Sequence, residues 1–187
     1  MKKLILILFL AVLQESCKKD VKVCTNYTEL SDRNHLVDPS TLGDSALIDT
    51  LNKRPELQVY KINSDQHGWV VKCNVFYQNL KVFSSQYYFN KNTGGSIYSL
   101  NTINLSSINF SLIPTISYGS AITTATQAVD YSQTCVSYRL GIYDLNSGSS
   151  FQPKNYKLVW KIQGESGLPY VILDANTSQI YHTDDGI

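Results

Sequence analysis

The sequence has no excess of either charge and is poor in histidine and methionine. The chain has 3 His and 1 Met, and its 16 basic and 15 acidic residues become 14 of each once residues 1–16 are set aside. Nucleic-acid-binding proteins normally carry a basic excess that neutralises the phosphates, so this balance argues against one. Hydrophobic residues still make up 43% of the chain, and 13 Tyr favour β-structure. The composition indicates a folded, sheet-rich protein.

Long apolar runs are also missing, apart from a short one at the N-terminus. Met1-Lys2-Lys3 precede ten apolar residues, Leu4 to Leu13, about half of the ~20 that a membrane-spanning helix needs. A basic start and a short apolar core are typical of a secretion signal. The following Ser16-Cys17 resembles a bacterial lipobox, which implies acylation (palmitate among the chains) at Cys17. We expect residues 1–16 to be a signal peptide and the lipoprotein to reach an outer membrane or the cell surface; the alternative is an ordinary signal with a chance cysteine.

Three cysteines remain beyond the predicted lipid site. An odd number allows at most one internal disulfide among Cys24, Cys73 and Cys135. Cys73 is in phase with Val71 and Val75, so we expect it on an apolar strand face as a buried free thiol. Whether Cys24 forms a disulfide is left open.

The rest of the chain repeats one order of elements. A polar stretch, residues 17–38, is expected to be a tether. A helical pattern between Ser40 and Lys53 precedes one set of strand patterns, and a helix from Ser117 to Val129, with Ser117 as its N-cap, precedes another. The expected strands cover residues 57–62, 69–77, 83–90 and 96–103, and then 136–142, 156–162, 168–174 and 179–183. Each half is therefore expected to be a small α+β module.

The end of the second half resembles the PepSY module. Tyr170-Val171-Ile172 and the following Asp174-Ala-Asn-Thr177-Ser178-Gln-Ile180 are similar to its closing hairpin, an aromatic strand followed by Asp-Ala-x-Thr-Gly-x-Ile. Ser178 takes the place of the usual glycine. The resemblance implies that Asp174, Thr177 and Ile180 are structural residues of this hairpin.

The first half resembles the propeptide module of thermolysin- and fungalysin-type metalloproteases. Tyr77-Gln-Asn79-Leu-Lys-Val82-Phe83 is similar to its signature Tyr-x-Gly-hydrophobic-Pro-Val-aromatic, in which Asn79 replaces the glycine. A propeptide module followed by PepSY is the order of such pro-regions. The resemblance implies an α+β fold of two cystatin-like modules in tandem, at residues 39–112 and 113–187, each with one helix packed on an antiparallel sheet of about four strands.

For each candidate set of catalytic or metal-binding residues in the sequence, a structural role is the better explanation. It has no His-Glu-x-x-His, and His35, His67 and His182 are far apart, whereas a zinc protease needs two His one helical turn apart. Asp174, Asn176, Ser178 and Asp185 have the spacing of a calcium loop, but Gln179 stands where that loop needs glycine, and a β-turn explains the same residues. We expect no enzyme, no metal and no cofactor.

Without its protease, such a pro-region would act on another protein. The leading hypothesis is a membrane-anchored, non-catalytic lipoprotein that binds a secreted peptidase of the thermolysin type in trans, as an inhibitor or a folding helper. His182, Asp184 and Asp185 are the candidate partner-binding residues, because the segment after PepSY leads toward the protease in such precursors. The alternative is a structural or adhesive cell-surface module with no protease partner.

Overall fold

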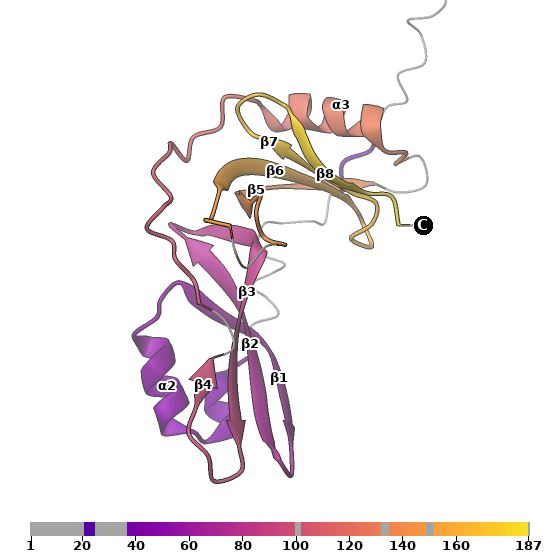
Figure 1. The fold of residues 1–187 in the computed structure, drawn as a ribbon. Helices are drawn as coiled ribbons and strands as arrows, with labels where there is room; N and C mark the ends of the chain where they lie inside the picture. The colour runs from indigo at the N-terminus through magenta and orange to yellow at the C-terminus, as the bar shows by residue number, and fades with distance from the viewer. Residues whose placement is uncertain (1–20, 25–36, 100–101, 132–134, 149–151, 187) are drawn as a thin grey trace, which may run out of the picture.

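The protein forms one curved β-sheet with a helix near each end (Figure 1). The computed structural model describes residues 21–24, 37–99, 102–131, 135–148 and 152–186. The predicted signal peptide, the predicted lipid site at Cys17 and His35 lie outside these residues. Among the described helices, none is long and apolar enough to cross a membrane.

The first half is a long hairpin with a short helix beside it. Its elements are the 3-10 helix η1 (Pro39–Leu42), helix α2 (Ser45–Asn52) and strands β1 (Leu57–Asp65), β2 (Gly68–Tyr77), β3 (Leu80–Asn92) and β4 (Tyr98–Ser99). Helix α2 begins after Asp44, whose carboxylate accepts a hydrogen bond from the Leu47 backbone at 3.2 Å, as an N-cap does. Leu47 is fully buried, which fixes the face of α2 that packs on the sheet.

The second half has the longer helix and the four remaining strands. These are α3 (Tyr118–Ala128), β5 (Val136–Asp144), β6 (Tyr156–Gly164), β7 (Tyr170–Asp174) and β8 (Ile180–Asp184). Ser117 Oγ accepts a hydrogen bond from Ser120 N at 3.2 Å, which confirms Ser117 as the N-cap of α3. The alternation of apolar and polar residues predicted β6 correctly, and Leu158, Trp160 and Ile162 of this strand pack in the cluster that contains α3.

The strands form one sheet, and the prediction of two tandem cystatin-like modules with separate sheets is wrong. Their order is β1-β2-β3-β5-β6-β7-β8, with β4 paired to β3. The link is a short parallel ladder in which Lys81 pairs with Gly141 and Val82 with Ile142; the other described strand pairs are antiparallel. The general α+β class is correct. Side-chain periodicity could not reveal the link, because strands pair through their backbones.

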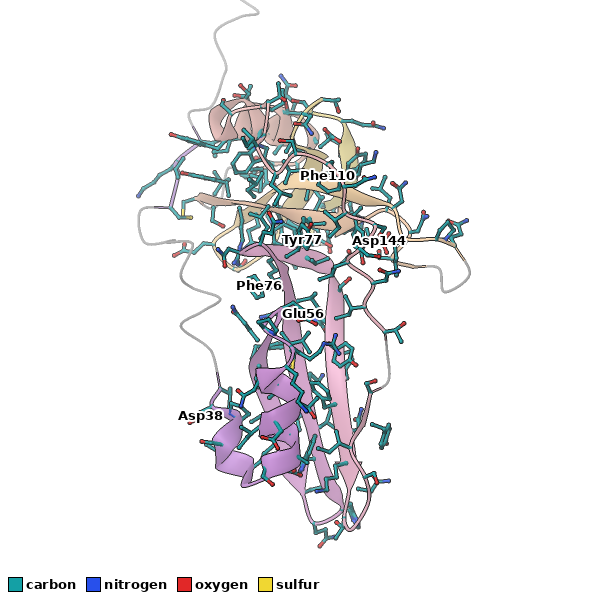
Figure 2. All side chains as sticks on the ribbon, turned by 90° about the vertical axis from the view of Figure 1, so that its left-hand side faces the viewer. Asp38, Glu56, Phe76, Tyr77, Phe110 and Asp144 are labelled. Atoms are coloured by element: carbon teal, nitrogen blue, oxygen red, sulfur yellow. A yellow bond between two sulfur atoms is a disulfide. The ribbon has the colours of Figure 1, made fainter. Side chains whose placement is uncertain are left out.

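Two hydrophobic clusters meet at the junction of the two halves. One surrounds Leu47 of α2 and the β1–β3 hairpin, and the other lies between α3 and strands β5–β7. Leu80, Phe110 and Leu112 pack against both clusters. Figure 2 shows Phe110 and Tyr77 at this junction, between the hairpin and the second half. The segment between β4 and α3 therefore contributes apolar contacts to both halves.

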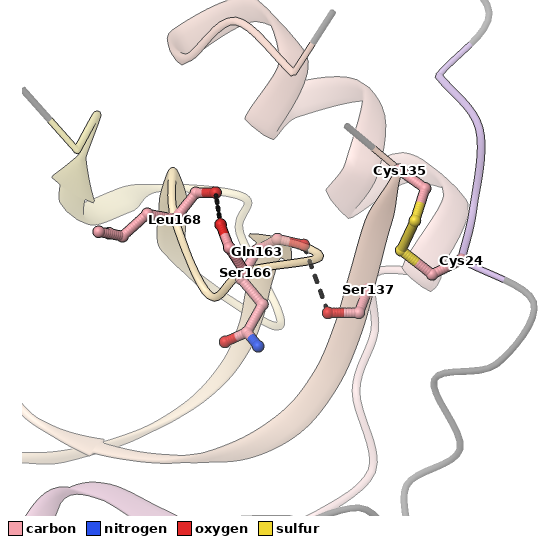
Figure 3. Close-up of a disulfide and its surroundings, with 6 residues drawn as sticks. All are labelled: Cys24, Cys135, Ser137, Gln163, Ser166 and Leu168. Atoms are coloured by element: carbon pink, nitrogen blue, oxygen red, sulfur yellow. Dashed lines mark hydrogen bonds between the residues drawn. A yellow bond between two sulfur atoms is a disulfide. The ribbon is translucent and has the colours of Figure 1, made fainter. Parts of the chain in front are cut away.

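The N-terminal residues 21–24 are attached to the sheet rather than separate from it. Cys24 N donates to Val136 O, and Val136 N donates to Lys22 O, both at 2.8 Å. Cys24 and Cys135 form a disulfide (Figure 3). The pairing that the sequence left open thus joins the predicted tether to the start of β5.

The remaining described cysteine, Cys73, is a buried free thiol, as predicted. Burial raises its pKa to about 12, because the thiolate would be desolvated. We expect Cys73 to resist alkylation by iodoacetamide at pH 8 in the native protein and to react fully once the chain is unfolded in guanidinium. Mass spectrometry of the alkylated peptide measures this. Rapid native modification would contradict the burial.

Candidate functional site

The candidate site is a groove on the face of the sheet opposite α3. In β5, Val136, Tyr138 and Leu140 face the helix cluster, so Ser137 and Arg139 point to the other face by the two-residue alternation of a strand. The register then places Gln163 and Tyr170 beside Ser137, and Lys161 and Ile172 beside Arg139. Strand β3 adds Lys81 and Phe83 at the parallel ladder.

The groove consists of two adjoining hollows. One has a volume of about 270 Å³ and lies over β5 and β6. The other has a volume of about 390 Å³ and extends along β3 toward β7. Both are lined by Lys81, Phe83 and Lys161. The groove is therefore elongated and crosses the junction between β3 and β5.

Aromatic rings and one lysine form the middle of the groove. A Cβ placed on Gly141 would press into the Phe83 ring, so the ring packs directly over this glycine. Lys161 Nζ lies 5.8 Å from the centre of the Phe83 ring and 4.7 Å from that of Tyr170. Both distances are within the range of cation–π attraction, which positions the ammonium group between the two rings.

The groove is basic in a chain that is nearly neutral. Its lining includes Lys81, Arg139 and Lys161, and no Asp or Glu occurs among the described residues that line either hollow. All three cationic side chains are half-buried. Three like charges in one concave surface attract anions more strongly than the same charges on a convex surface.

The predicted partner-binding residues lie on or near the last strand. His182 and Asp184 pair with Ile172 and Tyr170 in the β7–β8 register and so share the face that carries the groove. His182 Nε2 is 3.0 Å from the Tyr170 hydroxyl, and the two rings are stacked at 5.3 Å. Burial and the charge of Asp184 raise the pKa of Tyr170. Asp185 is exposed just after β8.

The residues of the propeptide-like motif surround the β2–β3 turn. Asn79 has φ 69°, the left-handed conformation that asparagine tolerates better than most residues. Val82 is fully buried in the first hydrophobic cluster, and Tyr77 OH donates to Ile108 O at 3.4 Å. Phe83 is the exception, because its ring belongs to the groove as well as to the motif.

The residues of the PepSY-like motif build the β7–β8 turn. Asp174 Oδ1 accepts hydrogen bonds from the backbone N–H groups of Asn176 at 2.7 Å and Thr177 at 2.9 Å, and Oδ2 accepts one from Tyr181 OH. Ser178 has φ 63°, at the position where the motif has glycine. Ile180 begins β8 and is partly exposed. This hydrogen-bonded turn is the structural explanation that we preferred to a calcium loop.

Replacing Asp174 with asparagine should destabilise the protein by about 1–3 kcal/mol, because a nearly buried, charge-assisted set of hydrogen bonds is weakened. Burial opposes ionisation of Asp174, but the hydrogen bonds from Tyr181 and the turn outweigh it and lower its pKa. Its stabilising effect is therefore complete above the unfolded-state pKa of about 3.9 and is lost as the pH falls through the lower folded value.

Urea unfolding of wild type and Asp174→Asn at pH 7 and near pH 3 would measure this effect. The difference between the two proteins should shrink at the lower pH. Asp49→Asn, on the exposed side of α2, is the matched control and should stay within about 0.5 kcal/mol of wild type. A pH-independent difference would contradict the assigned role of the carboxylate.

Metal ligands do not cluster in the part of the chain that the structure describes. No group of three or more His, Cys, Asp or Glu there could hold a metal ion. The two described histidines are far apart: His67 lies in the turn between β1 and β2, and His182 lies in β8, at the opposite edge of the sheet.

Sequence reasoning missed the three cationic residues of the groove. Lys161 alternates with the apolar side of β6, a pattern that a polar residue on any half-buried strand produces. Lys81 and Arg139 come from other strands, 58 residues apart in the numbering, and the β3–β5 ladder alone places them near each other. The sequence contains no local signal for that proximity.

Comparison with known proteins adds little to this description. No family model and no curated protein matches the sequence. Among solved structures, the chain is similar to the Bacillus megaterium YpeB C-terminal domain, with a TM-score of 0.43 and 12% sequence identity, over 88% of this chain and 68% of that chain. Similarity at this level carries no functional argument, so function must be argued from the residues of the groove.

Proposed function

We propose that the chain is a non-catalytic binding module that holds a secreted peptidase in trans, as an inhibitor or a folding helper. The observation that carries the proposal is the elongated, open groove on the face of the sheet opposite α3. His182 and Asp184, the residues that the pro-region resemblance singled out, lie on this same face. The peptidase itself comes from the sequence motifs and is a hypothesis.

The absence of catalysis is part of the proposal and has two supporting arguments. The thiol of Cys73 is buried with its pKa raised to about 12, so it is a poor nucleophile at neutral pH. His67 and His182 belong to opposite edges of the sheet, so neither can serve a shared site. Cys73, His67 and His182 therefore support a binding role for the chain rather than a catalytic one.

We also propose that the module lies close to the membrane surface that holds its lipid. Cys24 lies seven positions after Cys17, and seven extended residues span at most about 25 Å. Cys24 is attached to Cys135 at the start of β5. Labelling cells with a palmitate analogue tests the anchor: the wild-type chain should be labelled and Cys17→Ala should not. Equal labelling of the two would contradict it.

Capture of partners from the native secretome tests the proposed function. The mature chain, immobilised through its N-terminus, the end proposed to carry the lipid, should retain a peptidase, and adding the purified chain should slow that peptidase or raise its folding yield. His182→Ala should weaken retention, whereas His67→Ala, an exposed histidine in the distant β1–β2 turn, should not. Retention of glycans or surface proteins without any peptidase would contradict the proposal and favour the adhesive alternative.

A further inference from the structure

We propose that the side-chain amide of Asn74 binds a main-chain amide of an extended peptide segment in the groove. The inference rests on the proposed function, because such a segment would belong to the bound peptidase. Three features of the β3 side of the groove support it: a buried amide, the irregular strand pairing beside it and the uncharged polar groups around it.

The lining of the larger hollow includes an almost fully buried polar residue, Asn74. Its neighbours in β2, Cys73 and Val75, belong to the first hydrophobic cluster, so the Asn74 side chain points to the opposite face, where it lines the hollow. The residue is only 7% exposed, and no hydrogen bond joins its side chain to another described residue. A buried amide without a partner is unfavourable, so this amide can gain hydrogen bonds from a ligand.

An irregularity in the β2–β3 pairing opens the hollow beside Asn74. Asn74 pairs with Gln86, and the next pair along is Phe76 with Lys81. Between these pairs β2 advances by two residues (74 to 76) while β3 covers five (81 to 86). The extra residues of β3 that line the hollow are Phe83, Ser84 and Ser85. Bulges redirect side chains and are frequent next to functional sites, and this one borders a hollow of about 390 Å³.

Hydroxyl and amide groups surround Asn74 in the hollow. Ser84 Oγ accepts a hydrogen bond from Asp144 N at 2.8 Å, which leaves the hydroxyl proton for a ligand carbonyl. Gln86, the cross-strand neighbour of Asn74, is exposed and lines the same hollow. A main-chain amide offers one N–H and one C=O, which complement the C=O and NH₂ of asparagine. An extended peptide presents such amides all along an elongated groove.

A sugar chain fits the groove less well, although an acetamido sugar would offer the same amide. Sugars stack on the open faces of aromatic rings. Here Lys161 Nζ lies 4.7 Å from the centre of the Tyr170 ring and 5.8 Å from that of Phe83. The His182 ring also stacks on Tyr170, with 5.3 Å between the ring centres. Both rings are therefore already in contact with protein groups, which favours a peptide as the ligand.

NMR titration of the nitrogen-15-labelled mature chain, in detergent if the chain is acylated, tests the inference. The probe is an uncharged, capped octapeptide of alternating Thr and Gln. It should shift the side-chain amide signals of Asn74, which are assigned by their loss in Asn74→Leu. The same peptide with methylated backbone nitrogens should bind about tenfold more weakly, because its main-chain donors are gone.

A matched pair of variants tests the role of Asn74 itself. Asn74→Leu should weaken binding of the unmethylated peptide about tenfold, as expected for the loss of about two hydrogen bonds. Asn63→Leu makes the same substitution at an exposed position of β1 and should change binding less than about twofold.

Stability separates a binding role of Asn74 from a structural one. Leucine has nearly the shape of asparagine, and replacing a buried amide that has no partner with an apolar group is neutral or stabilising. Asn74→Leu should therefore keep or raise the urea midpoint of the wild type while it loses affinity for the peptide. A lower midpoint would show that the amide is bonded within the protein and would overturn the inference.

The remaining outcomes separate the inference from the proposed function. Unshifted Asn74 signals, equal binding of the two peptides, or equal losses for Asn74→Leu and Asn63→Leu would overturn the inference. Tighter binding of chitotetraose than of the octapeptide would overturn it in favour of an acetamido sugar. If a captured peptidase binds Asn74→Leu as tightly as wild type, the inference fails and the proposed function stands. If the octapeptide binds as predicted but no peptidase is retained, the proposed function alone fails.

Discussion

Replacing Cys24 and Cys135 together with serine is expected to lower the free energy of unfolding more than any other change considered for this protein. The two residues are 111 positions apart, and closing a loop of that size stabilises the folded state by about 4–5 kcal/mol in the chain-entropy account. A domain with a total stability of about 5–15 kcal/mol would lose a large part of it. The disulfide also holds residues 22–24 against Val136, at the end of the strand that lines the groove.

Guanidinium unfolding of the oxidised mature chain and of the double variant measures this loss. Each single variant should lose as much as the double, because either substitution removes the whole bond; the two effects should therefore be strongly non-additive. Reduction of the wild-type protein is the control that breaks the same bond without a substitution. A double variant within about 1 kcal/mol of wild type would contradict the expected role, since that is the size of an ordinary point mutation.

Substituting Gly141 with alanine is expected to break the connection between the two halves of the sheet. A Cβ at this position would lie 2.7 Å from the carbonyl oxygen of Lys81 and would press into the Phe83 ring. The ring could rotate, but the carbonyl belongs to the two-residue ladder that joins β3 to β5, so the backbone itself must shift. Overpacking of this kind costs about 1–3 kcal/mol. The groove, which spans the same ladder, should lose its shape as well.

Hydrogen exchange and thermal unfolding test this prediction. In Gly141→Ala, amide protection should fall at Val82 and Ile142, and the two hydrophobic clusters should unfold in two steps rather than one. Gly148→Ala is the matched control: it lies just after β5, and a Cβ there would meet no atom within 4 Å. Unchanged protection at the ladder in Gly141→Ala would show that the halves are held together by the contacts of Leu80, Phe110 and Leu112 alone.

Local patterns in the sequence were sufficient for the individual elements. The side-chain alternation from Tyr156 to Ile162 predicted β6, and Ser117 followed by apolar residues at helical spacing predicted α3. The turn at Asp174 was also predictable, because an aspartate followed by backbone N–H groups within three residues satisfies its own hydrogen bonds. Each of these features depends on residues a few positions apart, so neighbouring side chains contain the information.

The candidate site was predictable only in part. His182 and Asp184 were selected from their place after the PepSY-like hairpin, and they lie on the face that carries the groove. The centre of the groove was missed, because Lys81, Arg139 and Lys161 belong to three different strands. A polar residue on an alternating strand has the same pattern whether it faces bulk water or a basic hollow.

The chain's helices, strands and turns thus follow from contacts between near neighbours in the sequence, whereas its single sheet, its disulfide and its groove follow from contacts between distant ones. β3 pairs with β5 through backbone groups that every residue has, so no side-chain pattern predicts the pairing. Cys24 could have paired with Cys73 or Cys135, and folding brought it to Cys135 because residues 22–24 lie beside β5, while the β1–β3 hairpin buries Cys73. The basic groove exists because that same sheet brings three separate strands together.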